Sequence, residues 1–281
     1  MTTPKPRKRD HAQAVMTVQE KRRLTPGLVR LVLGGPGFST IRDNSHTDSY
    51  VKLLLPEPGS GLLPPYDLDA IRRDSPELLP MKRTYTVRRW DRDRGEIWID
   101  VVIHNEPGHT GIASDWADSA LPGDDIAVMG AGGGYSPNPS ARFHLLVGDL
   151  ATAPAIAASL EAMPDDARGA ALIQVEHAEN RLLDLRHPEG VPVSWIVGDQ
   201  DDLVDAVTKL SIEDSIVADR GVQVFCHAER GLTKRLRHHL VAERGIDRAD
   251  ISISAYWAQG RIEDEFQAEK KEPIGRIDPA A

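Results

Sequence analysis

The sequence predicts two domains, an N-terminal antiparallel β-barrel and a C-terminal α/β domain built on a parallel sheet. Its length of 281 residues favours two domains of ordinary size over one. The first half reads as short strands separated by turns, which is typical of a small barrel. In the second half apolar strands alternate with helical segments, which is typical of a parallel sheet.

The barrel strands are expected where apolar and polar residues alternate between turn signals. A Thr-Pro-Gly turn at residues 25–27 separates the first two strands, and Pro56 closes the third. Residues 56–80 are rich in Pro and Gly, and we expect a long connection of a kind that is usually functional or disordered. One short helix is expected after Thr110. The expected strands cover residues 14–18, 28–33, 49–55, 83–90, 97–104 and 125–129.

The second half contains continuous apolar runs, which predict strands buried on both faces. Expected strands cover residues 143–148, 169–176, 193–197, 222–227 and 251–254, and expected helices cover residues 152–163, 203–210 and 232–244. The Gly-rich string Gly130–Gly134 is interpreted as a hinge between the domains, and close approach by a ligand is the alternative. We therefore expect a barrel domain over residues 12–138, an α/β domain over residues 142–260 and a helical tail over residues 261–281.

The composition excludes several classes of protein. The net charge of -9 and pI near 5.6 argue against nucleic-acid binding, whereas the basic stretch 82–94 fits a small anionic ligand. No apolar run is long enough to span a bilayer, so we expect no membrane insertion. Cys226 is the single cysteine, which excludes internal disulfides and cysteine-ligated clusters and favours the reducing cytoplasm. We expect a monomer.

The string Arg83–Thr86 carries the first chemical signal. Arg83 and Tyr85 lie two residues apart on an expected strand, so their side chains share a face. A guanidinium suits a phosphate and a Tyr ring suits a planar heterocycle, so the pair is able to hold a flavin nucleotide. The alternative is an ordinary cross-strand Arg/Tyr pair.

Two later strings offer backbone sites for phosphates. Residues 109–114 open a helix, whose N-terminus binds anions, and the alternative is ordinary capping by Thr110. Residues 147–155 form a strand, a loop and a helix with Pro154 in its first turn. Nucleotides bind at such carboxyl ends of parallel strands, although a plain turn is the alternative. Neither Gly-x-Gly-x-x-Gly nor a P-loop is present.

The remaining candidates are aromatic or histidine side chains. Tyr256 and Trp257 follow the last expected strand, where they either cover a flavin or seal the two domains together. The histidines show no ligand spacing, since His238 and His239 are neighbours on a helix and face different directions. We therefore expect no metal site.

In this order the motifs resemble those of the siderophore-interacting proteins, FAD-dependent ferric-siderophore reductases of the ferredoxin–NADP reductase superfamily. The resemblance runs from about Val15 to Lys271. It rests on Tyr-Val-Lys-Leu at 50–53, Arg-Thr-Tyr-Thr at 83–86, Asp-Val-Val-Ile-His at 100–104, Gly-Ile-Ala-Ser-Asp-Trp-Ala at 111–117, Val-Gly-Asp at 147–149 with Ala-Pro-Ala at 153–155, and Tyr-Trp at 256–257 with Gly260.

The resemblance implies a flavin-binding barrel, a nicotinamide-nucleotide-binding second domain and a set of site residues for each ligand. Those implied for FAD are Arg83, Thr84, Tyr85, Thr86, Asp100, Val102, His104, His109, Thr110, Gly111, Ile112, Ala113, Ser114 and Trp257. Those implied for NADH or NADPH are Gly148, Asp149, Thr152, Ala153, Pro154 and Ala155. Those implied for the substrate are Lys52 and Arg261, and Arg261 stands in for a basic residue that the family often has directly after Tyr-Trp.

The activity that the resemblance implies is flavin-dependent reduction of a ferric siderophore, which releases ferrous iron. Glu176 and Glu179, at the end of the second strand of that domain, favour NADH, whereas Arg181 is able to accept the 2′-phosphate of NADPH. Ferredoxin stays open as an alternative donor. Rival functions are a related flavin reductase that passes electrons to a protein or to free flavin, and a non-enzymatic flavin- or siderophore-binding protein.

Overall fold

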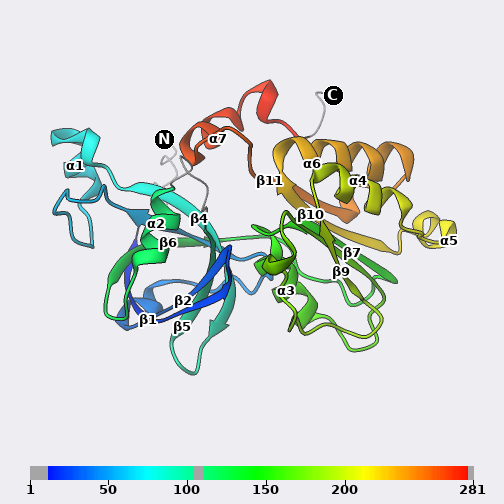
Figure 1. Ribbon diagram of the computed structural model, residues 1–281, viewed down its shortest axis with the longest axis horizontal. Coiled ribbons are helices and arrows are strands. Elements are labelled where there is room, and N and C mark those ends of the chain that lie inside the picture. Colours follow the sequence, from blue (N-terminus) through cyan, green and yellow to red (C-terminus); the bar gives the residue numbers. More distant parts are fainter. Residues whose placement is uncertain (1–11, 104–110, 278–281) are drawn as a thin grey trace, which may run out of the picture.

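A computed structural model describes residues 12–103 and 111–277, which form two domains lying side by side (Figure 1). The first is a closed barrel with the strand order β1-β2-β5-β4-β3-β6. Every neighbouring pair is antiparallel, which confirms the predicted barrel. Its strands are β1 (Gln13–Thr25), β2 (Leu28–Gly34), β3 (Tyr50–Leu55), β4 (Met81–Asp91), β5 (Glu96–Val102) and β6 (Asp125–Gly132).

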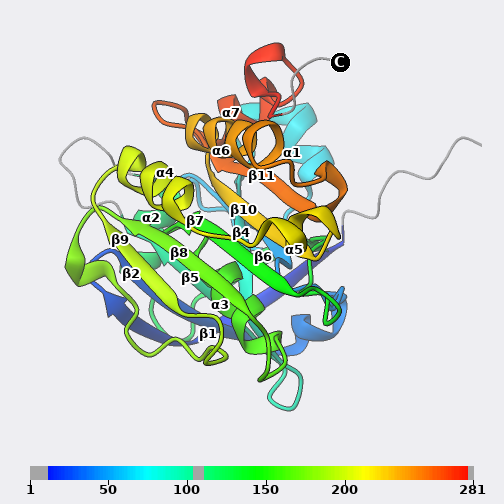
Figure 2. The same cartoon turned by 90° about the vertical axis from the view of Figure 1, so that its right-hand side faces the viewer.

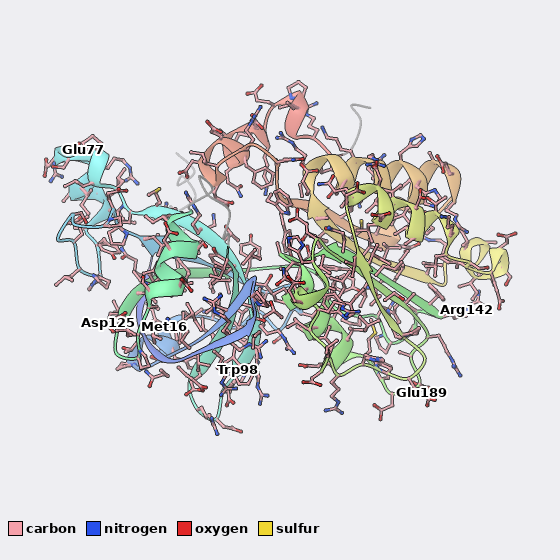
Figure 3. The ribbon with its side chains drawn as sticks, in the orientation of Figure 1. Met16, Glu77, Trp98, Asp125, Arg142 and Glu189 are labelled. Atoms are coloured by element: carbon pink, nitrogen blue, oxygen red, sulfur yellow. The ribbon has the colours of Figure 1, made fainter. Side chains whose placement is uncertain are left out.

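The barrel forms because alternate side chains of each strand are apolar and point inward. Met16, labelled in Figure 3, is fully buried in this core. Each such side chain contributes about 1.5–3 kcal/mol when it leaves water. Helix α2 (Ile112–Ser119) adds Ala113 and Ala117 to the same core. It thereby packs beside β2 and β5.

The long connection between β3 and β4 is partly helical. Helix α1 (Leu68–Asp74) begins after Asp67, whose carboxylate accepts a hydrogen bond from the Ala70 N–H at 2.9 Å. Buried Tyr66 packs with Leu54 and Ala127 and fastens the connection to the barrel. Strand-like alternation gave no hint of this helix, which packs Leu68 and Ile71 against the same cluster.

The second domain contains a five-stranded parallel sheet with the order β11-β10-β7-β8-β9, which confirms the predicted α/β domain (Figure 2). The strands are β7 (Phe143–Asp149), β8 (Gly169–Val175), β9 (Val193–Val197), β10 (Val222–Glu229) and β11 (Ile251–Trp257). The helices are α3 (Ala153–Ala162), α4 (Gln200–Lys209), α5 (Asp214–Ala218) and α6 (Arg230–Arg237), with a π-helix at His238–Glu243. Helix α3 covers one face of the sheet, and α4 and α6 cover the other.

The strand order places a switch point between β7 and β10. From β7 the chain passes through α3 to β8 on one side, and from β10 it passes through α6 to β11 on the other. Ligands of open α/β sheets bind in the crevice that such a reversal leaves at the carboxyl ends of the strands. The carboxyl ends of β7 and β10 are therefore the geometric candidate for a nucleotide site.

The two domains are joined by polar contacts along α3. Arg88 of β4 donates to the Glu161 carboxylate, with one of the two bonds at 2.9 Å. The Ser159 hydroxyl donates to Thr47 Oγ1 at 2.8 Å. The carboxylate of Asp48 accepts hydrogen bonds from the backbone N–H groups of residues 134 and 135, each at 2.8 Å. These bonds fix the C-terminal end of the Gly-rich string. Residues 130–132 belong to β6, so that part of the predicted hinge is strand.

After β11 the chain forms α7 (Glu263–Glu269), which lies above the junction of the two domains (Figure 1). The sequence predicted this charged helical tail, but not where it lies. Short 3-10 helices occur at Pro36–Thr40, Pro76–Leu78, Ala178–Asn180, Arg248–Asp250 and Pro273–Gly275. Over residues 12–103 and 111–277, no helix has the length and apolar character that crossing a bilayer would require.

Candidate active site

The first half of β4 has one free edge. Residues from Met81 to Thr86 pair with β3, whereas the pairing of β4 with β5 begins only at Val87. On that second edge, the backbone groups of residues 82–86 are not taken by a described strand. Backbone N–H and C=O groups in such a position are available to a ligand.

The two faces of this stretch carry different side chains. Arg83 and Tyr85 lie opposite the core residues Leu53 and Val51, so they share the face that the alternation predicts. Burial raises the pKa of the Tyr85 phenol, which therefore stays protonated. Thr84 and Thr86 point to the other face, so the structure separates the hydroxyl of Thr86 from the ring of Tyr85.

The guanidinium of Arg83 is a largely buried cation with few hydrogen-bond partners among the described residues. Its side chain is 16% exposed. The guanidinium donates to the Lys82 carbonyl oxygen at 2.9 Å and to the Met81 sulfur at 3.6 Å, and it lies 3.6 Å from the Asp264 carboxylate. A guanidinium has five N–H donors, so these contacts among the described residues leave donors for an anionic oxygen.

The other arginines of the basic stretch 82–94 do not join Arg83. Arg88 pairs with Glu161, and Arg92 donates to Asp43 at 2.6 Å. The Arg89 guanidinium lies 4.9 Å from the ring centroid of Trp98, a side chain labelled in Figure 3. The prediction of one local basic patch is therefore wrong, because alternation sends these side chains to separate faces and partners.

The remaining residues implied for FAD lie near the free edge or outside the described chain. Asp100 is buried and forms a two-bond ion pair with Arg30, at 2.6 and 2.7 Å, so its carboxylate is already occupied. Half-buried Val102 ends β5. At the start of α2, Gly111 and Ile112 are half-buried, and the next two residues, Ala113 and Ser114, are buried. His104, His109 and Thr110 lie outside the described residues.

Gly148 permits a close approach between β7 and α3. A Cβ there would lie 2.7 Å from the Thr152 Cβ and 2.8 Å from the His227 carbonyl oxygen. The Thr152 hydroxyl donates to that same carbonyl at 2.7 Å. Ala153, Pro154 and Ala155 follow in the first turn of α3 and are buried. The residues implied for the nicotinamide nucleotide therefore gather at the switch point.

Asp149 is buried and joins three segments. Its carboxylate accepts hydrogen bonds from the Thr152 backbone N–H at 3.2 Å, the Glu229 backbone N–H at 3.1 Å and the Trp257 indole N–H at 2.7 Å. Desolvation raises the pKa of this carboxyl, and the hydrogen bonds oppose that shift. The indole of Trp257 is thereby held against the second domain.

Tyr256 is the aromatic side chain that meets the barrel. Its ring lies edge-on to His227 at 5.0 Å between centroids, and its hydroxyl lies close to the side chain of Thr86 on the barrel. Sequence reasoning chose Trp257 for the flavin and gave sealing of the two domains as the alternative for both aromatic residues, without deciding which of them meets the barrel. Alternation along β11 carried the signal, because residue 256 shares a face with Ser252 and Ser254, away from the buried face that packs on α6.

His227 is a second residue that sequence reasoning missed. It is 5% exposed, stacks on Phe225 at 4.2 Å, and its Nε2 lies 3.0 Å from the Ser252 hydroxyl. Burial, with a contribution from the charge of Lys270, lowers the pKa of His227 to about 3. The imidazole is therefore neutral at physiological pH and belongs to the polar face of β10 and β11 that looks onto the barrel.

The two residues implied for substrate binding lie in different settings. Lys52 is exposed and stands on the outer face of β3, opposite Thr84 and two residues from Tyr50. Arg261 instead donates to the Glu269 carboxylate at 2.6 Å, so it ties the tail to the end of β11. Among the described residues, no group of three or more His, Cys, Asp or Glu side chains is arranged to hold a metal ion.

These features fit FAD. The free edge of β4 offers backbone groups, Arg83 has spare donors for a phosphate, and Tyr85 presents a half-buried ring at the mouth of the barrel core. On the opposite face, Thr86 and Tyr256 mark where the barrel meets the carboxyl ends of the parallel strands.

Two family models match the chain. The one described as "Siderophore-interacting FAD-binding domain" matches residues 17–135, and the one described as "Siderophore-interacting protein" matches residues 141–260. The first covers the barrel and the second covers the parallel sheet. The match to an FAD-binding domain agrees with the fit of the barrel site.

Curated relatives cover almost the whole chain. An uncharacterized protein of Mycobacterium tuberculosis is 39% identical over 269 residues, which is 89% of this chain and 92% of that protein. The ferric vibriobactin reductase ViuB of Vibrio cholerae is 31% identical over 89% of this chain and 91% of its own length. An NADPH-dependent ferric-chelate reductase of Escherichia coli is 29% identical over 86% and 91%.

Solved structures share the architecture. The siderophore-interacting protein SipS from Aeromonas hydrophila aligns with a TM-score of 0.76 at 29% identity, covering 95% of this chain and 99% of that one. The order of domains, barrel first and parallel sheet second, is therefore common to both proteins.

Proposed function

The chain belongs to the siderophore-interacting proteins, and from this premise we propose that it is an FAD-dependent reductase of ferric siderophores. Electrons would come from a nicotinamide nucleotide, and ferrous iron would leave the chelate. The observation that carries the proposal is the docking of β4 on the second domain, where Arg88 pairs with Glu161 of α3 and Thr86 lies close to Tyr256 near the carboxyl end of β11. Donor and acceptor sites thus meet at one junction.

In this proposal the barrel holds FAD along the free edge of β4. Arg83 binds a phosphate, the Tyr85 ring packs beside the planar heterocycle, and the Thr86 hydroxyl faces the second domain. The N-terminus of α2, from Gly111 to Ser114, takes the pyrophosphate, because backbone N–H groups at a helix start favour anions. Bound FAD supplies the exchange between a two-electron hydride donor and a one-electron ferric acceptor.

The second domain orients the nicotinamide nucleotide at the switch point. Because Gly148 has no side chain, β7 can lie close to the start of α3. The hydrogen bonds of Thr152 and Asp149 hold β7, β10 and β11 together. None of these residues has to take up a proton for hydride transfer. The buried His227 is neutral, so its imidazole adds no charge of its own to the junction.

We propose NADH as the preferred donor. Glu176 directly follows β8 and is exposed, at the place where acidic residues bind a ribose 2′-hydroxyl and repel a 2′-phosphate. Glu176→Ala is expected to lower the ratio of NADH to NADPH turnover severalfold. The matched control is Glu189→Ala, an exposed glutamate near the start of β9 at the other end of the sheet (Figure 3). An unchanged ratio in Glu176→Ala would overturn this assignment.

The function is tested by following the flavin spectrum without oxygen. The purified protein is expected to be yellow, to bleach with NADH, and to recover its colour when a ferric siderophore is added. A ferrous chelator should then capture the iron, since ferrous iron is bound less tightly by hard oxygen ligands than ferric iron. A protein that contains no flavin and takes up no FAD would refute the proposal.

A further inference from the structure

A hydrogen bond joins the first turn of the barrel to the segment that follows β8 in the second domain. The backbone N–H of Gly27, which lies between β1 and β2, donates to the side-chain oxygen of Asn180 at 2.8 Å. Asn180 is half-buried, whereas the four residues before it are exposed. The partners are 153 residues apart in the chain, so the bond depends on the docking of the two domains.

The absence of a side chain at Gly27 makes this contact possible. A Cβ at that position would lie 2.9 Å from both the oxygen and the nitrogen of the Asn180 amide. The carbonyl oxygen of Gly27 accepts a hydrogen bond from the Ile103 N–H at 2.9 Å, so the barrel holds this residue in place. The Thr-Pro-Gly turn therefore has a second role, which is to contact the other domain.

The segment that ends at Asn180 is held at both ends. The backbone N–H of Asn180 donates to the His177 carbonyl oxygen at 3.0 Å and closes a short 3-10 helix. At the end of β8, the Val175 carbonyl oxygen accepts a hydrogen bond from the Gly198 N–H, also at 3.0 Å. Residues 176–179 are thus held between a bond inside the second domain and a bond to the barrel.

This segment carries the charges that distinguish the two nicotinamide nucleotides. Glu176 and Glu179 are exposed, and a carboxylate in this place binds a ribose 2′-hydroxyl and repels a 2′-phosphate. The cation able to accept a phosphate is Arg181, whose Nε donates to the Ala178 carbonyl oxygen at 2.8 Å. The turn therefore exposes the acids and directs the guanidinium back onto its own backbone.

We propose that Asn180 is a positioning residue for the choice between NADH and NADPH. It acts through Glu176, whose place beside the proposed nucleotide site depends on the bond from Gly27. The inference rests on the proposed function and deepens it, because the selectivity of the second domain then depends on its docking to the barrel. Without the bond, Glu176 loses its fixed place and Arg181 becomes able to reach a 2′-phosphate.

One hydrogen bond is enough for this effect because little else holds the segment. Residues 176–179 are all exposed, and exposed segments with few packing contacts have the lowest local stability in a protein. The net contribution of one hydrogen bond corresponds to a change of roughly three- to tenfold in an equilibrium constant. The loss of the Asn180 side chain is therefore expected to change nucleotide affinity by a similar factor.

The test measures binding of NAD+ and NADP+ to the oxidised, FAD-loaded protein by calorimetric titration. Neither nucleotide carries a hydride, so binding is separated from electron transfer. In Asn180→Ala, the dissociation constant for NAD+ is expected to rise roughly three- to tenfold, while that for NADP+ should not rise. In turnover, the KM for NADH should rise by the same factor with kcat unchanged, which a general loss of folding would not produce.

Two further variants separate the hydrogen bond from the fold. Asn180→Asp keeps an oxygen that accepts from the Gly27 N–H and is expected to keep at least the wild-type preference for NAD+. Gly27→Ala displaces the amide from the barrel side and should lower the preference as Asn180→Ala does. The double variant Gly27→Ala with Asn180→Ala should lower it no further, because both changes remove the same contact.

The matched control is Asn44→Ala. Asn44 is likewise half-buried, and its side-chain oxygen accepts a backbone N–H, from His46 at 3.2 Å, but within the barrel domain. This control should keep the wild-type preference. An unchanged preference in Asn180→Ala, or an equal loss in Asn180→Asp, would overturn the positioning role.

Failure of the proposed function gives a different result. A wild-type protein that binds neither nucleotide, or that prefers NADP+, would refute the proposed donor and the positioning role together. If the variants change the preference as expected but ferric chelates are not reduced, the proposed function fails and the positioning role stands.

Discussion

Arg83 and Asp149 show how a buried charge either binds a ligand or holds the structure together. The guanidinium of Arg83 has donors to spare after its contacts with Lys82 and Met81. The carboxylate of Asp149 accepts bonds from three segments and has little capacity left. Spare hydrogen-bonding capacity in a buried group is costly unless a ligand takes it up. At the residue scale, we therefore propose that Arg83 is a binding group, whereas Asp149 holds three segments of the second domain together.

Arg83→Ala is expected to weaken FAD binding by a factor of roughly ten to one hundred, because charged hydrogen bonds to phosphate are lost. The measurement is the dissociation constant for FAD, from fluorescence recovery on dilution of the holoprotein. Arg92→Ala is the control, since that exposed arginine lies at the other end of the same hairpin and pairs with Asp43. Equal FAD affinity in the two variants would contradict the role of Arg83.

Because of His227, the free energy of unfolding is expected to fall as the pH becomes acidic. In the folded protein its pKa is about 3, against a model-peptide value of 6.5, so between these pH values only the unfolded chain binds the proton. The stability contributed by the neutral ring is thus complete above pH 6.5 and is lost as the pH falls. The slope attributable to this group is at most roughly 1.4 kcal/mol per pH unit.

His227→Gln is therefore expected to flatten the acid side of the plot of unfolding free energy against pH. Denaturant titrations between pH 7 and pH 4 provide the measurement, and the slope matters more than the absolute stability. His238→Gln is the control, because that histidine is exposed beside Glu243. If both variants keep the wild-type slope, the neutral state of His227 is not the source of the acid sensitivity.

At the scale of elements, the junction of β7 with α3 decides whether the nucleotide site can form. The strand passes directly under the first turn of the helix, with no space for a side chain at position 148. A glycine that permits close approach is the feature that nucleotide-binding turns share, although this chain lacks their usual spacing. The element pair, and not a sequence fingerprint, therefore defines the site.

Gly148→Ala is expected to destabilise the protein by about 1–3 kcal/mol, because its Cβ would overlap Thr152 and the His227 carbonyl oxygen. The affinity for NADH should fall in parallel while the affinity for FAD is retained. Thermal unfolding and ligand titration measure these effects. Gly134→Ala is the control, since nothing lies within 4 Å of a Cβ at that position. Similar melting temperatures for both variants would show that β7 and α3 relax without cost.

At the scale of the whole molecule, the catalytic arrangement depends on how the two domains are held together. The largely buried Arg88 of β4 pairs with Glu161 of α3, and Thr84 of β4 donates a hydrogen bond to Glu263 of α7. These contacts keep the free edge of β4 facing the carboxyl ends of the sheet. Interfaces between domains are usually polar and of modest size, so single contacts matter.

Arg88→Met is expected to weaken the coupling of the domains and cost about 1–3 kcal/mol, because Glu161 loses its partner. Calorimetric unfolding should then separate into two transitions, one for each domain. Arg142→Met is the control, since the exposed pair of Arg142 with Asp219 lies within the second domain (Figure 3). A single transition in both variants would show that the pair of Arg88 with Glu161 is not needed to couple the domains.

The sequence by itself determined the two-domain architecture, the barrel followed by the parallel sheet, and the strand that carries Arg83 and Tyr85. These follow from periodicity and turn chemistry, which are local properties of the chain. The family resemblance, based on short strings in a given order, was likewise readable without coordinates, and the family comparisons agree with it. The assignments of individual ligand-binding residues stay predictions.

Only the tertiary structure decided which side chains meet. It directed Tyr256 to the barrel and Trp257 to Asp149, tied Arg261 to Glu269, and brought Glu263 of the tail to Thr84 of the barrel. The physical reason is that these partners are distant in sequence. Their proximity depends on the docking of two domains and a tail, which no local pattern encodes.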